Sequence, residues 1–119
     1  MKELGKTIDD TYSENTIIEC ILAFYDTYCK SDRLRLYSYF STAFQKEVPL
    51  NYFLIHPDFN IDLGKLREIK NIRVEKNNLI AVEITVEINN KDRDIVVTLI
   101  KDFGGLKIEG ESIFRGNFS

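Results

Sequence analysis

The sequence contains no tryptophan, one histidine and two cysteines among its 119 residues. A structural zinc site of the common type needs four cysteine or histidine ligands, so the sequence predicts no such metal centre. Cys20 and Cys29 lie in one segment of helical periodicity. Their spacing places them on opposite helix faces and about 13 Å apart along the axis. That is too far for a disulfide, and it favours free thiols in a reducing, cytoplasmic compartment.

Long hydrophobic runs and basic clusters are also absent. The apolar stretches are much shorter than the roughly 20 residues of a membrane span, and residues 1–10 lack the apolar centre of a signal peptide. The 16 basic and 19 acidic residues are interleaved and give a net charge of −3. No basic run is long enough to predict nucleic-acid binding. A mildly acidic surface is, however, compatible with a basic partner.

The composition is that of an ordinary globular domain. Apolar residues make up 44% of the chain and charged residues 29%, which is enough to build a core without metals or disulfides. Eight phenylalanines and six tyrosines are present, and many of them fall between residues 12 and 59. We therefore expect the N-terminal half to supply the bulky side of the core. Residues 1–12 are predicted to be a flexible or short lead-in and residues 13–119 a single domain.

Helical periodicity dominates residues 13–45. Ser13 is a suitable N-cap, and apolar residues follow at helical spacing to about residue 30. A second helix is predicted over 33–45, with Pro49 ending that run. Residues 46–66 are harder to assign: 51–55 fits a short helix or an edge strand, and His56-Pro57-Asp58 favours a turn.

The period changes to two from Arg67 onward. The segment 79–88 alternates between aliphatic residues and Glu or Thr, and a strand over 94–101 follows a turn at 89–93. A three-residue turn at 77–79 would pair Val74 with Val82 and also set Arg73 opposite Glu83. A two-residue Asn-Asn turn would put the core residues on the wrong face, so we expect the longer turn. With a last strand at 106–108, the sequence predicts an α+β fold in which the helices pack on a curved antiparallel meander of four or more strands.

This order of elements resembles the NTF2-like superfamily, also called the cystatin-like α+β cone. The resemblance covers about residues 13–115 and is carried by the helices, the junction at Asp32 and the closing segment 99–108, Leu-Ile-Lys-Asp-Phe-Gly-Gly-Leu-Lys-Ile. Leu106 takes the position where the family has an aromatic residue. The resemblance implies helices on the concave face of a curved sheet and a cone that in some members is a pocket. Family members include isomerases, dehydratases, small-ligand binders, trafficking adaptors and immunity proteins, and many dimerise through the sheet.

The candidate site residues come from the helical half and the turn after it. They are predicted to bind a ligand and comprise Tyr25, Tyr28, Phe40, Tyr52, His56 and Asp58. A mostly apolar pocket with a few hydroxyl groups is typical of ligand sites, although core tyrosines with hydroxyls at the rim give the same pattern. His56 and Asp58 fit a general acid–base pair, but a solvated turn in which Asp58 binds its own backbone is favoured. Neither cysteine is assigned a catalytic role, and no metal or cofactor is predicted.

The residues expected on the concave face of the sheet are all aliphatic. They are Ile72, Val74, Ile80, Val82, Ile84, Val86, Ile88, Ile95, Val97, Leu99, Leu106 and Ile108. Such a face offers no proton carrier, which argues against catalysis. We therefore expect a non-catalytic binding or protein-interaction domain, of the immunity or accessory type. A carrier of a hydrophobic small ligand and a small enzyme using His56 and Asp58 are the alternatives. The predicted outer face is charged, so a homodimer would need a polar interface or another surface.

Overall fold

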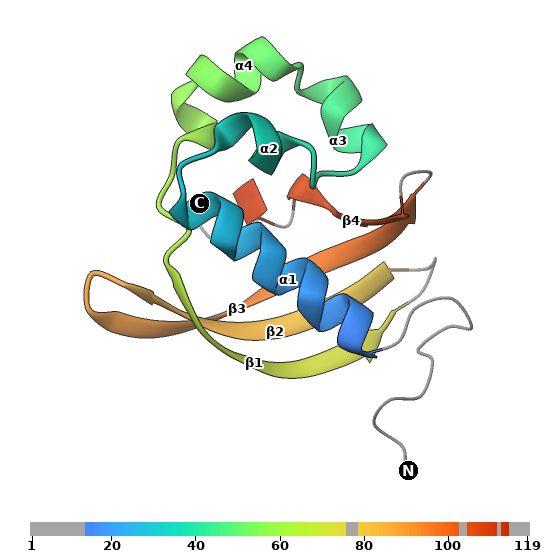
Figure 1. The fold of residues 1–119 in the computed structure, drawn as a ribbon, viewed down its shortest axis with the longest axis vertical. Helices are drawn as coiled ribbons and strands as arrows, with labels where there is room; N and C mark the ends of the chain where they lie inside the picture. Colours follow the sequence, from blue (N-terminus) through green and yellow to red (C-terminus); the bar gives the residue numbers. More distant parts are fainter. Residues whose placement is uncertain (1–13, 76–78, 103–104, 112, 115–119) are drawn as a thin grey trace.

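The computed structural model describes residues 14–75, 79–102, 105–111, 113 and 114, and they form an α+β fold (Figure 1). The helices are α1 (Glu14–Cys29), α2 (Arg33–Tyr37), α3 (Thr42–Glu47) and α4 (Leu50–Ile55), followed by the short 3₁₀ helix η1 (Pro57–Phe59). The strands β1 (Lys65–Val74), β2 (Leu79–Ile88), β3 (Lys91–Asp102) and β4 (Gly105–Ile108) form one antiparallel sheet in sequence order. The predicted lead-in 1–12 and N-cap Ser13 lie outside the described residues.

The helices lie over one face of the sheet, whose strands bend beneath them (Figure 1). The aliphatic face of β2 and β3 packs against α1: Ile80, Val82, Ile84, Val86, Val97 and Leu99 are fully buried, as are Ile17, Ile21 and Phe24. This confirms the predicted inner face of β2, although Ala81 and Thr85 on its other face are buried as well. Each such side chain contributes about 1.5–3 kcal/mol by leaving water. Val74, at the end of β1, is the exception among the predicted inner residues because it is 49% exposed.

The single helix predicted over 33–45 is wrong, because the chain leaves the helix between α2 and α3. Phe40 forms a parallel bridge with Ile108 of β4, and the Ser41 N–H donates to the Ile108 carbonyl at 2.9 Å. The Ser41 hydroxyl then accepts from the Phe44 N–H and begins α3. The Gln45 side-chain amide donates to the Tyr37 and Phe40 carbonyls at the break, and the Tyr37 carbonyl also accepts the Phe40 N–H. The interruption therefore covers the edge of β4.

The predicted pairing of β1 with β2 is also wrong in register. Val74 pairs with Ile80 instead of Val82, and Arg73 lies opposite Ala81 instead of Glu83. The Glu75 N–H donates to the Leu79 carbonyl at 2.7 Å, so these two residues flank the turn, which begins one residue earlier than predicted. Residues 77 and 78 of the predicted turn lie outside the described residues. The register differs from the predicted one by two residues. Because side chains alternate with a period of two, the same face of β2 remains buried.

The next hairpin is tighter than the predicted turn at 89–93. Asn89 and Asn90 have φ angles of 55° and 65°, and Ile88 pairs with Lys91 directly after them. Positive φ at both central residues is the geometry of a type I′ turn, and asparagine tolerates it better than most residues. The tight turn adds residues to the start of β3, which begins at Lys91 instead of the predicted Asp94.

Candidate functional site

Tyr25 and Tyr28 use their hydroxyl groups to hold the chain before β1. The Tyr25 hydroxyl donates to the Leu63 carbonyl at 3.0 Å. The Tyr28 hydroxyl accepts from the Leu63 N–H at 3.0 Å and donates to the Asp62 carboxylate at 3.3 Å. Burial raises the pKa of Tyr25 well above its ordinary value, and burial also raises the pKa of Tyr28, with the Asp62 carboxylate adding to the effect. The hydroxyl groups of Tyr25 and Tyr28, which were predicted to bind a ligand, therefore bond the protein's own backbone.

Phe40 is a core residue and does not reach the surface. It is 1% exposed, and its ring centroid lies 5.7 Å from those of Phe24, Phe53 and Phe114 and 4.7 Å from that of Phe44. These rings fill the space between the helices and the β4 side of the sheet. Edge-on and tilted aromatic pairs of this kind stabilise a core by more than the burial of their apolar area alone.

Tyr52, His56 and Asp58 lie together on the surface of α4 and η1. The Tyr52 and His56 rings are stacked with centroids 4.4 Å apart. Nδ1 of His56 accepts from the Asp58 backbone N–H at 3.1 Å, and it lies 3.6 Å from the Asp58 carboxylate. The histidine thus caps η1, and the Asp58 side chain is 74% exposed. The turn is therefore held by a bond between the His56 side chain and its own backbone, and the Asp58 carboxylate and the Tyr52 ring face solvent.

An open groove borders this turn and has a volume of about 490 Å³. Its lining is formed by Glu47, Val48, Pro49, Tyr52, Asp58 and Phe59, and it is called the acidic groove below. The groove brings together Tyr52 and Asp58 of the predicted site with Glu47 and Phe59, which sequence reasoning did not select. Two carboxylates beside two aromatic rings can hold a cation by charge and by the ring faces.

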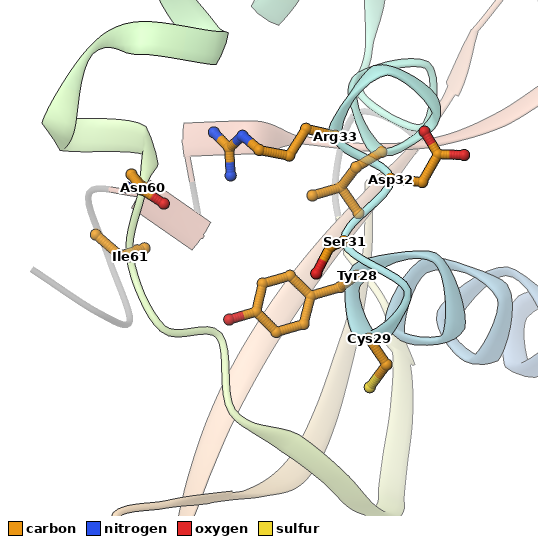
Figure 2. A pocket seen from close by; sticks show the side chains of 8 residues that line it. Tyr28, Cys29, Ser31, Asp32, Arg33, Asn60 and Ile61 are labelled. Atoms are coloured by element: carbon orange, nitrogen blue, oxygen red, sulfur yellow. The ribbon is translucent and has the colours of Figure 1, made fainter.

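A second hollow, of about 360 Å³, lies where α1 meets α2, and it is called the Arg33 pocket below (Figure 2). Tyr28, Cys29, Ser31, Asp32, Arg33, Leu36, Asn60 and Ile61 line it. Nη2 of Arg33 donates to the Phe53 carbonyl at 2.9 Å and to the Phe59 carbonyl at 3.0 Å, and Cζ lies 4.7 Å from the centre of the Phe53 ring. These bonds hold the ends of α4 and η1 against α2. Of the predicted site residues, only Tyr28 lines this pocket.

Comparison with known proteins identifies no relative: no protein-family model, no curated protein and no solved structure matches this chain.

The two cysteines differ in environment. Burial raises the pKa of the Cys20 thiol from 9.0 to about 11, and its Sγ lies 4.0 Å from the Leu106 carbonyl. A thiol with a raised pKa is a poor nucleophile at neutral pH. Cys29 is exposed. Within the described ranges no three His, Cys, Asp or Glu side chains are grouped to hold a metal ion, and no described helix is long and apolar enough to cross a membrane.

Proposed function

We propose that this chain is a non-catalytic protein-interaction domain of the NTF2-like type, and that the acidic groove is its recognition surface. The observation that carries the proposal is that the aliphatic face of the sheet is covered by packed side chains. Phe24, Phe40 and Ile84 are at most 1% exposed. The linings of the acidic groove and the Arg33 pocket include none of the sheet's inner-face residues. Recognition through the exterior is the use that this arrangement supports best.

The hydroxyl and imidazole groups support the same conclusion. The Tyr25 hydroxyl is bonded to the Leu63 carbonyl, and Nδ1 of His56 is bonded to the Asp58 N–H. A general base must be free to take a proton from a substrate, and a ligand handle must face a cavity. These side chains instead stabilise two turns. They give little support to the carrier and enzyme alternatives.

The chemistry of the acidic groove indicates a basic side chain of the partner. Glu47 and Asp58 supply negative charge, and Tyr52 is 45% exposed with one face of its ring covered by His56, so a cation would meet the opposite face. The net charge of −3 would steer a basic segment toward the protein. The outer face of the sheet suits a basic partner less, because several of its carboxylates are already paired with basic side chains. Lys70 contacts Asp94 at 3.2 Å and Arg67 contacts Glu87 at 3.4 Å.

The proposal is tested by titrating ¹⁵N-labelled protein with an acetylated and amidated peptide of alternating glycine and lysine. A peptide with acetylated lysines is the neutral control. We expect the backbone amide resonances of Tyr52 and Phe59 to shift and saturate with the charged peptide and not with the neutral control. Loss of one exposed ion pair costs about 0.2–1 kcal/mol, so Asp58→Asn and Glu47→Gln are each expected to weaken binding about 1.4- to 5-fold.

The matched control is Glu19→Gln, which removes the same charge from an exposed position of α1. It should leave the affinity unchanged to within about 1.5-fold, since a distant exposed charge is largely screened. Shifts spread over all acidic surfaces, or an equal loss of affinity in Glu19→Gln, would show non-specific attraction and would contradict the proposal.

A further inference from the structure

Arg33 is a partly buried cation whose charge is incompletely compensated. Its Nη2 group is bonded to two carbonyl oxygens, whereas Nε is buried and no described residue accepts a hydrogen bond from it. No Asp or Glu in the described part of the chain forms an ion pair with it. The neighbouring Asp32 accepts the Arg35 N–H at 3.1 Å and points away from the guanidinium (Figure 2). Removing a charge from water is costly unless an opposite charge approaches it.

The Arg33 pocket places hydrogen-bonding groups beside this cation. Asn60 and Arg33 extend toward one another from opposite walls, and the Ser31 hydroxyl lies between Arg33 and the Tyr28 ring (Figure 2). Asn60 is exposed, and no described residue is bonded to its side-chain amide. Ser31 has a φ of 60°, which fixes the sharp corner between α1 and α2. The pocket therefore presents a cation, an amide and a hydroxyl from two separate segments of the chain.

We propose that the Arg33 pocket binds the carboxylate group of a small monoanionic ligand. Nη1 of Arg33 donates to one carboxylate oxygen and the Asn60 amide to the other, while the apolar part of the ligand lies against Leu36 and Ile61. Charge-assisted hydrogen bonds of this kind are among the strongest that proteins make. Asp32 lines the same pocket and the net charge is −3, so a second negative charge on the ligand is disfavoured. This site is separate from the acidic groove and does not rest on the proposed function.

The first test uses the wild-type protein. ¹⁵N-labelled protein is titrated at constant ionic strength with propionate and, separately, with propionamide, which has the same size and no charge. We expect saturable shifts with propionate at the Arg33 Nε–H, the Asn60 side-chain amide and the Ser31 backbone amide, and no such shifts with propionamide. Equal shifts with both compounds, or shifts centred elsewhere, would overturn the proposal. Tighter binding of inorganic phosphate than of propionate would overturn the monoanion assignment.

A second arm distinguishes the two sources of such a carboxylate. The dipeptide acetyl-Gly-Leu with a free C-terminus is compared with its amidated form. Binding of the free form at least about threefold tighter than propionate indicates the C-terminus of a peptide, and weaker binding indicates a free small acid. Both results support a carboxylate site. Binding of the amidated form as tightly as the free form contradicts it.

Variants then test whether propionate binding depends on the Arg33 guanidinium. Arg33→Met is expected to weaken propionate binding by about tenfold or more, because it removes the cation. Arg35→Met is the matched control, since Arg35 is exposed on the same helix and does not line the Arg33 pocket. An equal loss in Arg35→Met would refute the assignment. Because Arg33 also bonds two carbonyls, Asn60→Ala provides a variant that leaves those bonds intact, and we expect it to weaken binding by about threefold.

Discussion

Replacing Gly64 by alanine is expected to be unusually destabilising, because two independent costs meet at this residue. Gly64 has a φ of +81°, a region that residues with a side chain rarely adopt. A Cβ atom at this position would lie 2.8 Å from Cγ1 of Ile88, 3.0 Å from Cβ of Val86 and 3.1 Å from the Glu87 carbonyl oxygen. The chain passes this close to β2 because the next residue, Lys65, pairs with Glu87, and the Gly64 N–H donates to the Asp62 carboxylate at 2.9 Å. The residue therefore sets how β1 begins.

The magnitude follows from adding the two costs. A left-handed conformation costs alanine about 1–2 kcal/mol, and overpacking a close contact costs about 1–3 kcal/mol. Gly64→Ala is therefore expected to lower the free energy of unfolding by about 2–5 kcal/mol. Two other glycines separate the terms. Gly105 has a φ of +111°, but a Cβ there meets no atom of the described residues within 4 Å. Gly110 has no positive φ, but its Cβ would collide with the Phe44 ring.

Equilibrium unfolding in urea measures all three variants. Gly105→Ala is expected to show only the conformational cost and Gly110→Ala only the cost of a collision, which is closer than the one at Gly64, so Gly64→Ala should lose more stability than Gly105→Ala. The slope of the free energy against urea concentration should be unchanged, so that differences in midpoint report stability. A loss below about 1 kcal/mol in Gly64→Ala, or one no larger than in Gly105→Ala, would refute the reasoning.

Two further predictions concern side chains of α1. Tyr25→Phe leaves the buried Leu63 carbonyl without its hydroxyl donor and is expected to cost about 1–3 kcal/mol in the same urea assay, with no change in propionate binding. The raised pKa of Cys20 means that the unfolded chain loses this thiol proton above pH 9.0 and the folded chain only near pH 11. Stability should therefore fall as pH rises through this window, and the fall should be shallower in Cys20→Ala. Identical slopes in the two proteins would contradict the assigned burial.

The parts of the fold that could be predicted are those with a strong local period. α1 repeats apolar residues at helical spacing, and β2 alternates from Val82 to Ile88, so each segment has one favourable way to bury its apolar side. The break between α2 and α3 could not be predicted in the same way. Phe40 leaves the helix to pair with Ile108, a partner near the other end of the chain. Local periodicity contains no information about such a contact.

The register of β1 next to the turn was mispredicted because the hairpin closes at Glu75 and Leu79, and farther from the turn the strand is also irregular. Its pairing with β2 shifts between Leu66 and Glu68 and again between Ile69 and Asn71. Each irregularity inserts a residue without an opposite partner, so the partly buried positions become Leu66, Ile69 and Ile72, three residues apart. A sequence rule based on strict alternation cannot follow that spacing. The irregularities and the charged residues of β1 also discourage pairing of this edge with another sheet.

The residues of the candidate site divide in the same manner. Sequence reasoning selected tyrosines as ligand handles, but Tyr25 and Tyr28 lie one helical turn apart and both reach the turn at Leu63. What the hydroxyls would meet depends on where the chain returns, and only the structure fixes that.

Arg33 is the residue that sequence reasoning missed, although a signal was present. It is the first residue of α2, where a positive charge opposes the helix dipole, and Cys29 and Tyr37 at the positions four residues away supply no carboxylate. A cation placed at local cost requires a tertiary role. Nη2 fulfils one such role by joining the Phe53 and Phe59 carbonyls to α2. The remaining N–H groups are not needed for that contact. A lysine could not bond the two carbonyls and also bind a ligand carboxylate, so the arginine at this position supports a bound ligand in addition to the structural contact.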